Sequence, residues 1–205
     1  MNYSECIEQA RKRIGNYCKA CPECNGKACR DQMPGPGSKG IGDTAIRNYD
    51  KWKEIRLQMD TIAENKPVDT SLELFDKTFQ YPFFAGPVGA VQLHYGDCQT
   101  DVTYNDILVS ACAEYGIAAF TGDGIDSNVM VAATKAIQKT DGIGIPTVKP
   151  WNLDTIKEKM DLVHASKAFA VAMDIDAAGL PFLKNLDPPA GSKTVEELRQ
   201  IIKLA

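Results

Sequence analysis

The sequence lacks the features that would place the protein in a membrane or on a nucleic acid. No apolar run reaches the roughly 18 residues that a membrane-spanning helix needs, and the polar stretch MNYSECIEQARKR at the N-terminus has no signal-peptide core. Basic residues are not in excess, since 23 Lys and Arg stand against 27 Asp and Glu, for a net charge of −4. We therefore expect a cytoplasmic protein whose partners include no nucleic acid and no membrane.

Two nucleotide-binding motifs are also absent, and histidine is rare. The Gly- and Pro-rich stretch MPGPGSKGIG at 33–42 does not match the P-loop pattern GxxxxGK[ST], and no GxGxxG pattern of a Rossmann fold follows a predicted strand. His94 and His164 are the only histidines. Hydrophobic residues make up 44% of the 205 residues, which is enough for one large domain, or for one domain with an appendage.

Cysteine, in contrast, is abundant and clustered. In a cytoplasmic chain, seven cysteines indicate metal ligands or reduced thiols in preference to disulfides. Two-residue gaps let one loop wrap a tetrahedral zinc ion or an iron–sulfur cluster, and the alternative is a loop of reduced thiols. The predicted metal ligands, in CKACPECNGKAC, are Cys18, Cys21, Cys24 and Cys29. We expect residues 1–42 to form a helical, Cys-rich segment that ends in a Gly/Pro loop.

Residues 43–205 repeat a unit of strand, loop and helix. The units recur every 26 to 34 residues, a spacing typical of right-handed βαβ units in a parallel sheet. Buried strands are predicted at 82–85, 117–120, 143–148 and 168–175. Helices are predicted at about 43–59, 103–115 and 127–139, after Asn152, and from Thr194 to Ala205, with a hairpin from 72–75 and 78–81. The pattern favours an α/β fold, either a doubly wound sheet or a (β/α)8 barrel of which four units are present.

The first buried strand opens the most distinctive stretch, YPFFAGPVGAVQLHYGD at 81–97. A short apolar run breaks abruptly into Gly86, Pro87, Val88 and Gly89. Glycine lets another group approach the backbone closely because it has no side chain. In parallel α/β proteins, ligands bind at this carboxyl end of the strands. The alternative is a tight turn with no ligand.

Several motifs together resemble one enzyme family. PFFAGPVGA, LHYGD, GIAAFTGDG, GIGIPTVKPW and AFAVAMDIDAAGLP occur in an order and spacing similar to the FMN-dependent α-hydroxy acid oxidase and dehydrogenase family, which includes glycolate and lactate oxidases. The resemblance covers about residues 43–205. It implies a (β/α)8 TIM barrel with only the first four βα units present, and the oxidation of a 2-hydroxy acid to a 2-oxo acid with hydride transfer to FMN.

The resemblance also implies functional residues. Asp176 matches the carboxylate that orients the catalytic histidine, and such a carboxylate fixes the imidazole tautomer. Lys149 stands where the family has a substrate-binding tyrosine, so it is the candidate substrate ligand, and the alternative is a solvated lysine. The residues that match flavin contacts are Pro87, Val88, Gly89, Gly122, Thr147 and Asp174.

Other family features have no match in the sequence. A second substrate tyrosine is absent from the Gly/Pro loop, and His94 and His164 do not lie at the place of the catalytic histidine. In the family, that histidine, the flavin lysine, the substrate arginine and the phosphate-binding loops follow the fourth unit. We therefore expect an N-terminal half that is inactive alone and whose partner is a C-terminal half or a second copy, since a half-barrel exposes strand edges and apolar surface.

Two alternatives to the hydroxy acid oxidoreductase stay open. One is a metal-binding or electron-transfer module in which the cysteine cluster sits on an α/β scaffold without flavin chemistry. The other is an FMN barrel enzyme of a different reaction type, such as a type 2 isopentenyl diphosphate isomerase, because the substrate tyrosines are missing.

Overall fold

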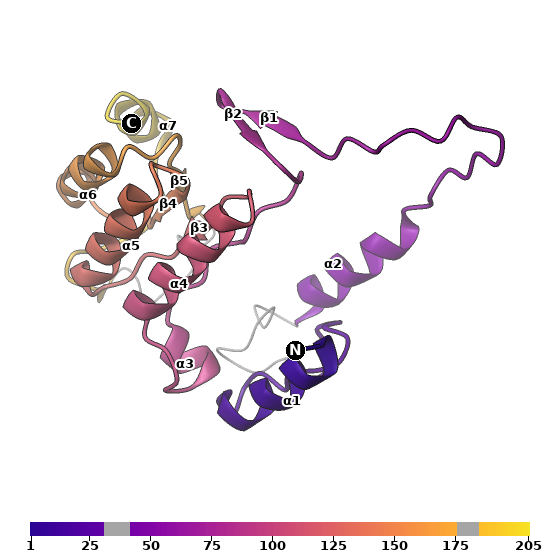
Figure 1. The fold of residues 1–205 in the computed structure, drawn as a ribbon. Helices are drawn as coiled ribbons and strands as arrows, with labels where there is room; N and C mark the ends of the chain where they lie inside the picture. The colour runs from indigo at the N-terminus through magenta and orange to yellow at the C-terminus, as the bar shows by residue number, and fades with distance from the viewer. Residues whose placement is uncertain (31–41, 176–184) are drawn as a thin grey trace. The chain divides into compact units, whose positions relative to one another are not determined.

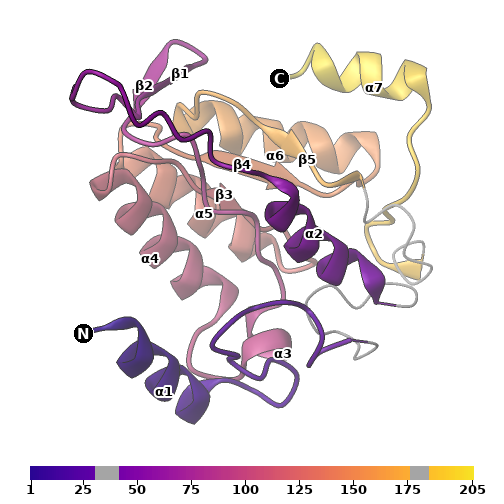
Figure 2. The same ribbon diagram turned by 90° about the vertical axis from the view of Figure 1, so that its right-hand side faces the viewer.

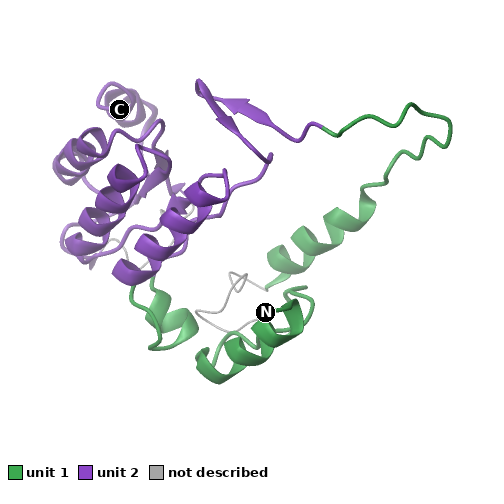
Figure 3. Cartoon of the chain, in the orientation of Figure 1, with its two compact units in different colours: residues 1–68, 90–100 green, residues 69–89, 101–205 purple. Residues whose placement is uncertain are grey.

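The computed structural model describes residues 1–30, 42–175 and 185–205 (Figure 1). The chain divides into two compact units, coloured separately in Figure 3. Unit 1 consists of Met1–Val68 and Ala90–Thr100, and unit 2 of Asp69–Gly89 and Asp101–Ala205. The predicted boundary at residue 42, between the Cys-rich segment and the half-barrel, does not coincide with these units and stays a prediction.

Unit 1 is helical. Helix α1 (Tyr3–Arg13) begins with a capping box in which Asn2 and Glu5 satisfy each other's backbone N–H groups. Helix α2 (Asp43–Glu54) ends five residues earlier than predicted, because the chain is already extended at Ile55. The short helix α3 (Val91–Tyr95) is hydrogen-bonded to the chain that follows α1. The Gly15 N–H donates to the Tyr95 carbonyl over 2.8 Å.

Unit 2 contains the predicted parallel strands in the predicted order. Strands β3 (Phe120–Thr121), β4 (Ile145–Val148) and β5 (Ala172–Met173) pair in parallel in the order β3-β4-β5. The 82–85 segment adds to the β3 side through a parallel bridge between Ala85 and Ala119. The predicted hairpin is also present, as the antiparallel strands β1 (Leu72–Leu74) and β2 (Lys77–Phe79).

Three helices lie side by side on one face of the parallel strands (Figures 1 and 2). They are α4 (Asp101–Glu114), α5 (Ser127–Lys139) and α6 (Leu153–Ser166), and α7 (Val195–Ile202) packs near α6. Helices α6 and α7 begin where the sequence predicts, since the side chains of Asn152 and Thr194 cap them, whereas α4 begins at Asp101, two residues before the predicted start at Thr103. The α/β class is therefore confirmed.

The core of unit 2 lies between these helices and the strands. One cluster packs Met130 from α5 against Ile156 and Met160 from α6. A second cluster packs Val109 from α4 against Ile137 from α5. Within the described ranges the parallel strands form an open sheet and not a closed barrel. None of the described helices has the length and apolar character needed to cross a membrane.

Gly142 provides a test of this packing, because it occupies a left-handed conformation between α5 and β4. Its φ is 82°, and a Cβ atom there would lie 2.1 Å from the Lys167 carbonyl oxygen. We expect Gly142→Ala to lower the free energy of unfolding by roughly 2 to 5 kcal/mol through backbone strain and overlap. Urea denaturation followed by circular dichroism measures the change.

Gly191→Ala is the matched control, since no atom lies within 4 Å of a Cβ atom built there. Its stability should stay within about 0.5 kcal/mol of the parent chain. Equal effects at both positions would contradict the packing described here.

Candidate active site

The carboxyl ends of the parallel strands form one rim of unit 2. Because parallel strands all run in the same direction, the loops after Ala85, β3, β4 and β5 emerge at the same edge of the sheet. The resemblance predicts the flavin and substrate contacts in these four loops. The described part of the rim therefore contains the predicted flavin and substrate contacts.

The first two loops approach each other closely through glycine. A Cβ atom on Gly122 would lie 2.1 Å from the Val88 carbonyl oxygen, and one on Gly89 would lie 3.3 Å from the Asp123 carbonyl oxygen. The structure thus brings together three predicted flavin contacts, Val88, Gly89 and Gly122, through their backbones. Pro87 in the same loop is exposed. The absence of a side chain at Gly122 is what lets the two backbones approach this closely.

Two buried hydroxyl groups at the ends of β3 and β4 have no hydrogen-bond partner within the described part of the chain. They belong to Thr121, with 0% of its surface exposed, and to Thr147, with 4% exposed. A buried polar atom without a partner is costly, and a ligand is one way to satisfy it. Thr147 is a predicted flavin contact, so its unused hydroxyl fits the polar edge of such a ring.

Lys149 and Asp174 form an ion pair at the rim. The Lys149 Nζ atom lies 3.0 Å from the Asp174 Oδ2 atom, and the two side chains are 22% and 28% exposed. The backbone supports this geometry, because the Asp174 N–H donates to the Val148 carbonyl over 2.9 Å. The predicted substrate ligand is therefore held by a carboxylate and is not a solvated lysine.

Asp123 is a further rim residue, and no sequence motif predicted a role for it. Its side chain is fully buried and accepts a hydrogen bond of 2.8 Å from the Lys159 ammonium group of α6. The indole N–H of Trp151 and the backbone N–H of Lys149 also donate to it. One signal was available in the sequence, because Lys159 lies on the apolar stripe of its helix, which also contains Ile156, Met160 and Val163. A buried lysine needs an anionic partner.

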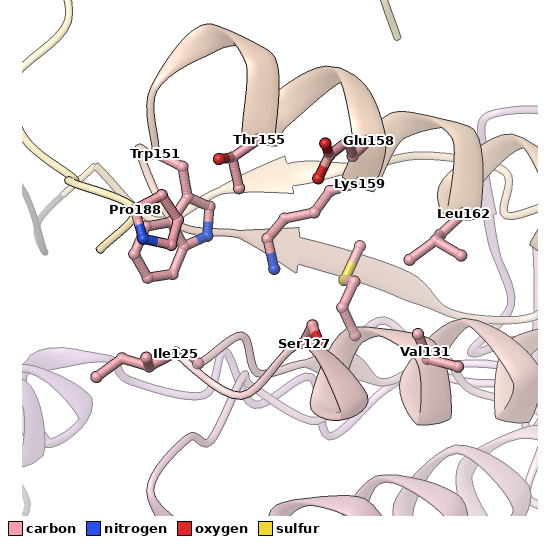
Figure 4. A pocket seen from close by; sticks show the side chains of 11 residues that line it. Ile125, Ser127, Val131, Trp151, Thr155, Glu158, Lys159, Leu162 and Pro188 are labelled. Carbon is pink, nitrogen blue, oxygen red and sulfur yellow. The ribbon is translucent and has the colours of Figure 1, made fainter. Parts of the chain in front are cut away.

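A pocket of about 260 Å³ lies beside this ion pair (Figure 4). The Lys159 side chain extends into it from α6, with its ammonium group 5.5 Å from the centre of the Trp151 ring. Met130, Val131 and Leu162 give it an apolar wall. The pocket lies between α5 and α6, and none of the predicted flavin or substrate contacts lines it.

The remaining predicted residues lie elsewhere. Asp176 is outside the described residues. His164 is exposed on α6, where its Nε2 atom lies 3.3 Å from the Ala205 carbonyl oxygen, in keeping with a surface position. No group of three candidate metal ligands comes together within the part of the chain that the structure describes, so the predicted site at Cys18, Cys21, Cys24 and Cys29 is not formed there.

The four cysteines nevertheless lie near one another. Burial, and then the charge of Cys24, raises the pKa of the Cys29 thiol from its ordinary value of 9.0. Cys18 and Cys21 raise the pKa further. None of the four cysteines forms a disulfide among the described residues.

The comparison with protein families agrees with the geometry of the rim. The model of the FMN-dependent dehydrogenase family matches residues 36–185, which is more than half of the chain. The chain belongs to this family. A comparison with curated proteins found no match. The family resemblance of the motifs is thus confirmed, and an FMN-dependent oxidoreductase is favoured over the isomerase and over a scaffold without flavin.

The residues present at the rim of this family member fit FMN. The backbone of Gly122 packs directly against that of Val88 with no side chain between them, and the buried Thr147 hydroxyl has no partner among the described residues. Together with Pro87 and Asp174, these residues could hold the flavin ring.

The raised pKa of Cys29 can be measured. Because the thiolate is the nucleophile, a higher pKa leaves less of it at a given pH. We expect the iodoacetamide alkylation rate of Cys29 to reach half its maximum above pH 9.0, at a higher pH than that of N-acetylcysteine. Mass spectrometry of quenched time points gives the rate at this residue. A half-maximal rate below pH 9.0 would show that burial and the neighbouring thiols do not act in this way.

Proposed function

We propose that this family member oxidises a 2-hydroxy acid to a 2-oxo acid, with the rim of unit 2 binding the ring of FMN. The observation that supports the proposal is the meeting of Val88, Gly89 and Gly122 beside the unpartnered hydroxyl of Thr147. Bound FMN would accept the hydride that leaves the substrate carbon. The barrel of the family would be completed by further βα units, supplied by a C-terminal half or a second copy.

Each part of the rim has a distinct task in this proposal. The backbone of the two glycine-containing loops would hold the ring and exclude water from it. The Thr147 hydroxyl, which can donate and accept, hydrogen-bonds the polar edge of the ring. Asp174, at the end of β5, adds a carboxylate near that edge, and its charge is balanced by Lys149.

Lys149 is the proposed ligand of the substrate carboxylate. An ammonium group has three N–H donors, and the hydrogen bond to Asp174 uses one of them. A substrate anion must share the ammonium group with Asp174, so we expect weaker substrate binding than an unpaired lysine would give. Asp176 would orient the imidazole that takes the hydroxyl proton, and this role stays a prediction.

Gly122→Ala tests the flavin site directly. The added methyl group would overlap the Val88 carbonyl and push apart the two loops that contact the ring. We expect the dissociation constant for FMN to rise about tenfold or more, equivalent to about 1.4 kcal/mol. Quenching of FMN fluorescence during titration with protein measures it.

Gly86→Ala is the matched control, because a Cβ atom there meets nothing within 4 Å. It lies in the same loop as Val88 and should change the dissociation constant less than twofold. Unchanged FMN binding in Gly122→Ala would remove the support for this site.

A second proposal concerns the N-terminal cysteines. We propose that Cys18, Cys21, Cys24 and Cys29 bind zinc or an iron–sulfur cluster when the metal is supplied. The supporting observation is that the other three cysteines lie close enough to raise the pKa of the Cys29 thiol. A bound metal would draw the thiols into a tetrahedron with Zn–S bonds of about 2.3 Å.

Elemental analysis of protein purified without oxygen tests this proposal. We expect about one zinc ion or one cluster per chain, and its loss in Cys24→Ser. Cys98→Ser, which changes an exposed cysteine outside the cluster, should keep the metal. A chain containing neither zinc nor iron would identify the cluster as reduced thiols.

A further inference from the structure

The carboxylate of Asp123 collects four hydrogen-bond donors. Its Oδ1 atom accepts from the Lys159 ammonium group over 2.8 Å and from the Gly124 N–H over 2.9 Å. Its Oδ2 atom accepts from the Lys149 N–H over 2.9 Å and from the Trp151 indole N–H over 2.6 Å. Each oxygen therefore has two donors, and the side chain has no exposed surface.

These donors come from different parts of the rim. Gly124 belongs to the loop after β3, Lys149 and Trp151 belong to the loop after β4, and Lys159 belongs to α6. The two oxygens also divide the work. Oδ1 balances the buried charge of Lys159, whereas Oδ2 ties the loop after β3 to the loop after β4.

The loops that Oδ2 ties together carry the proposed ligand contacts. Gly122 directly precedes Asp123 and packs on the Val88 carbonyl. Thr147 is the penultimate residue of β4, and Lys149 directly follows the strand. The backbone N–H of Lys149 is the group that donates a hydrogen bond to Asp123. A change in the Asp123 carboxylate therefore reaches the flavin contacts and the substrate lysine at once.

We propose that Asp123 is the positioning residue of the rim, which fixes Gly122, Thr147 and Lys149 relative to one another through its Oδ2 atom. The ligand roles of these three residues rest on the proposed function. The positioning itself rests on the four hydrogen bonds and the complete burial of the carboxylate. Lys159 acts differently, since it neutralises Asp123 through the Oδ1 atom and lies over the Trp151 ring without taking the Oδ2 atom.

Asp123→Asn separates the two oxygens. The amide keeps one oxygen and replaces the other by an NH2 group, which cannot accept a hydrogen bond. The buried ammonium group of Lys159 holds the remaining oxygen, because a charge-assisted hydrogen bond is stronger than a neutral one. The NH2 group then faces Lys149 and Trp151, and both of their N–H groups lose their acceptor.

The Trp151 indole N–H reports this loss by NMR. The chain has two tryptophans, and they differ sharply, since Trp151 is 1% exposed and Trp52 is 76% exposed. In the parent chain we expect a downfield, slowly exchanging indole proton for Trp151 and a rapidly exchanging one for Trp52. In Asp123→Asn the Trp151 proton and the Lys149 amide should exchange at least about tenfold faster, while Trp52 stays unchanged.

The double variant Asp123→Asn/Lys159→Met predicts a partial rescue. Without the ammonium group, the amide oxygen is free to turn toward Lys149 and Trp151, where it serves two donors instead of one. We expect the slow exchange of Trp151 to return in part, and the dissociation constant for FMN, raised about tenfold in Asp123→Asn, to fall again. A residue that only contributes to stability gives no such rescue.

Asp106→Asn is the matched control, because it removes a lysine–aspartate pair of the same 2.8 Å distance on exposed side chains. It should leave the Trp151 signal and FMN binding unchanged. If Asp123→Asn does not fold by circular dichroism, Lys159→Met decides, since it keeps both Asp123 oxygens. Lys159→Met should keep the slow exchange of the Trp151 indole proton. Exchange as fast as in the double variant would overturn the proposal.

The remaining outcomes are also decisive. An unchanged Trp151 signal in folded Asp123→Asn, or a folded double variant that exchanges as fast as Asp123→Asn, overturns the positioning role. A parent chain that binds no FMN contradicts the proposed flavin site, and the exchange of Trp151 and Lys149 then judges the positioning role alone.

Discussion

The buried charge of Asp123 is the constraint that the rest of the rim has to meet. A carboxylate with no exposed surface is costly unless other groups donate hydrogen bonds to it and a cation neutralises it. Both oxygens are satisfied only when α6 places Lys159 beneath the rim and the loop after β4 turns its N–H groups inward. The register of the strands, the rotation of α6 and the path of the loop are thus linked through one side chain.

The same rim shows where the family's chemistry fits. The Gly122 backbone packs so closely against the Val88 carbonyl that no side chain fits between the two loops. The hydroxyl of Thr147, in contrast, is buried with no partner among the described residues. A buried hydroxyl without a partner costs free energy in the folded chain. Lys149 and Asp174 pair at the same rim, with the ammonium nitrogen 3.0 Å from the carboxylate oxygen.

The N-terminal segment follows different physics. Its thiols lie close enough to raise the pKa of Cys29, yet no three ligands in the described part of the chain adopt a metal-binding arrangement. Thiolates gathered without a cation repel one another, which favours protonated thiols. A metal ion would reverse this preference, since it deprotonates its thiol ligands.

The sequence by itself determined the local elements and their order, because those depend on near neighbours. Apolar runs ending in Gly, Pro or Asp predicted the parallel strands, the caps Asn152 and Thr194 predicted helix starts, and the motifs of the rim predicted the family. Only the tertiary structure decided which side chains meet. Asp123 and Lys159 are 36 residues apart, and Lys149 and Asp174 are 25 apart. Each pair forms only when neighbouring strands align in register and α6 packs on the sheet, so no local pattern around either residue specifies its partner.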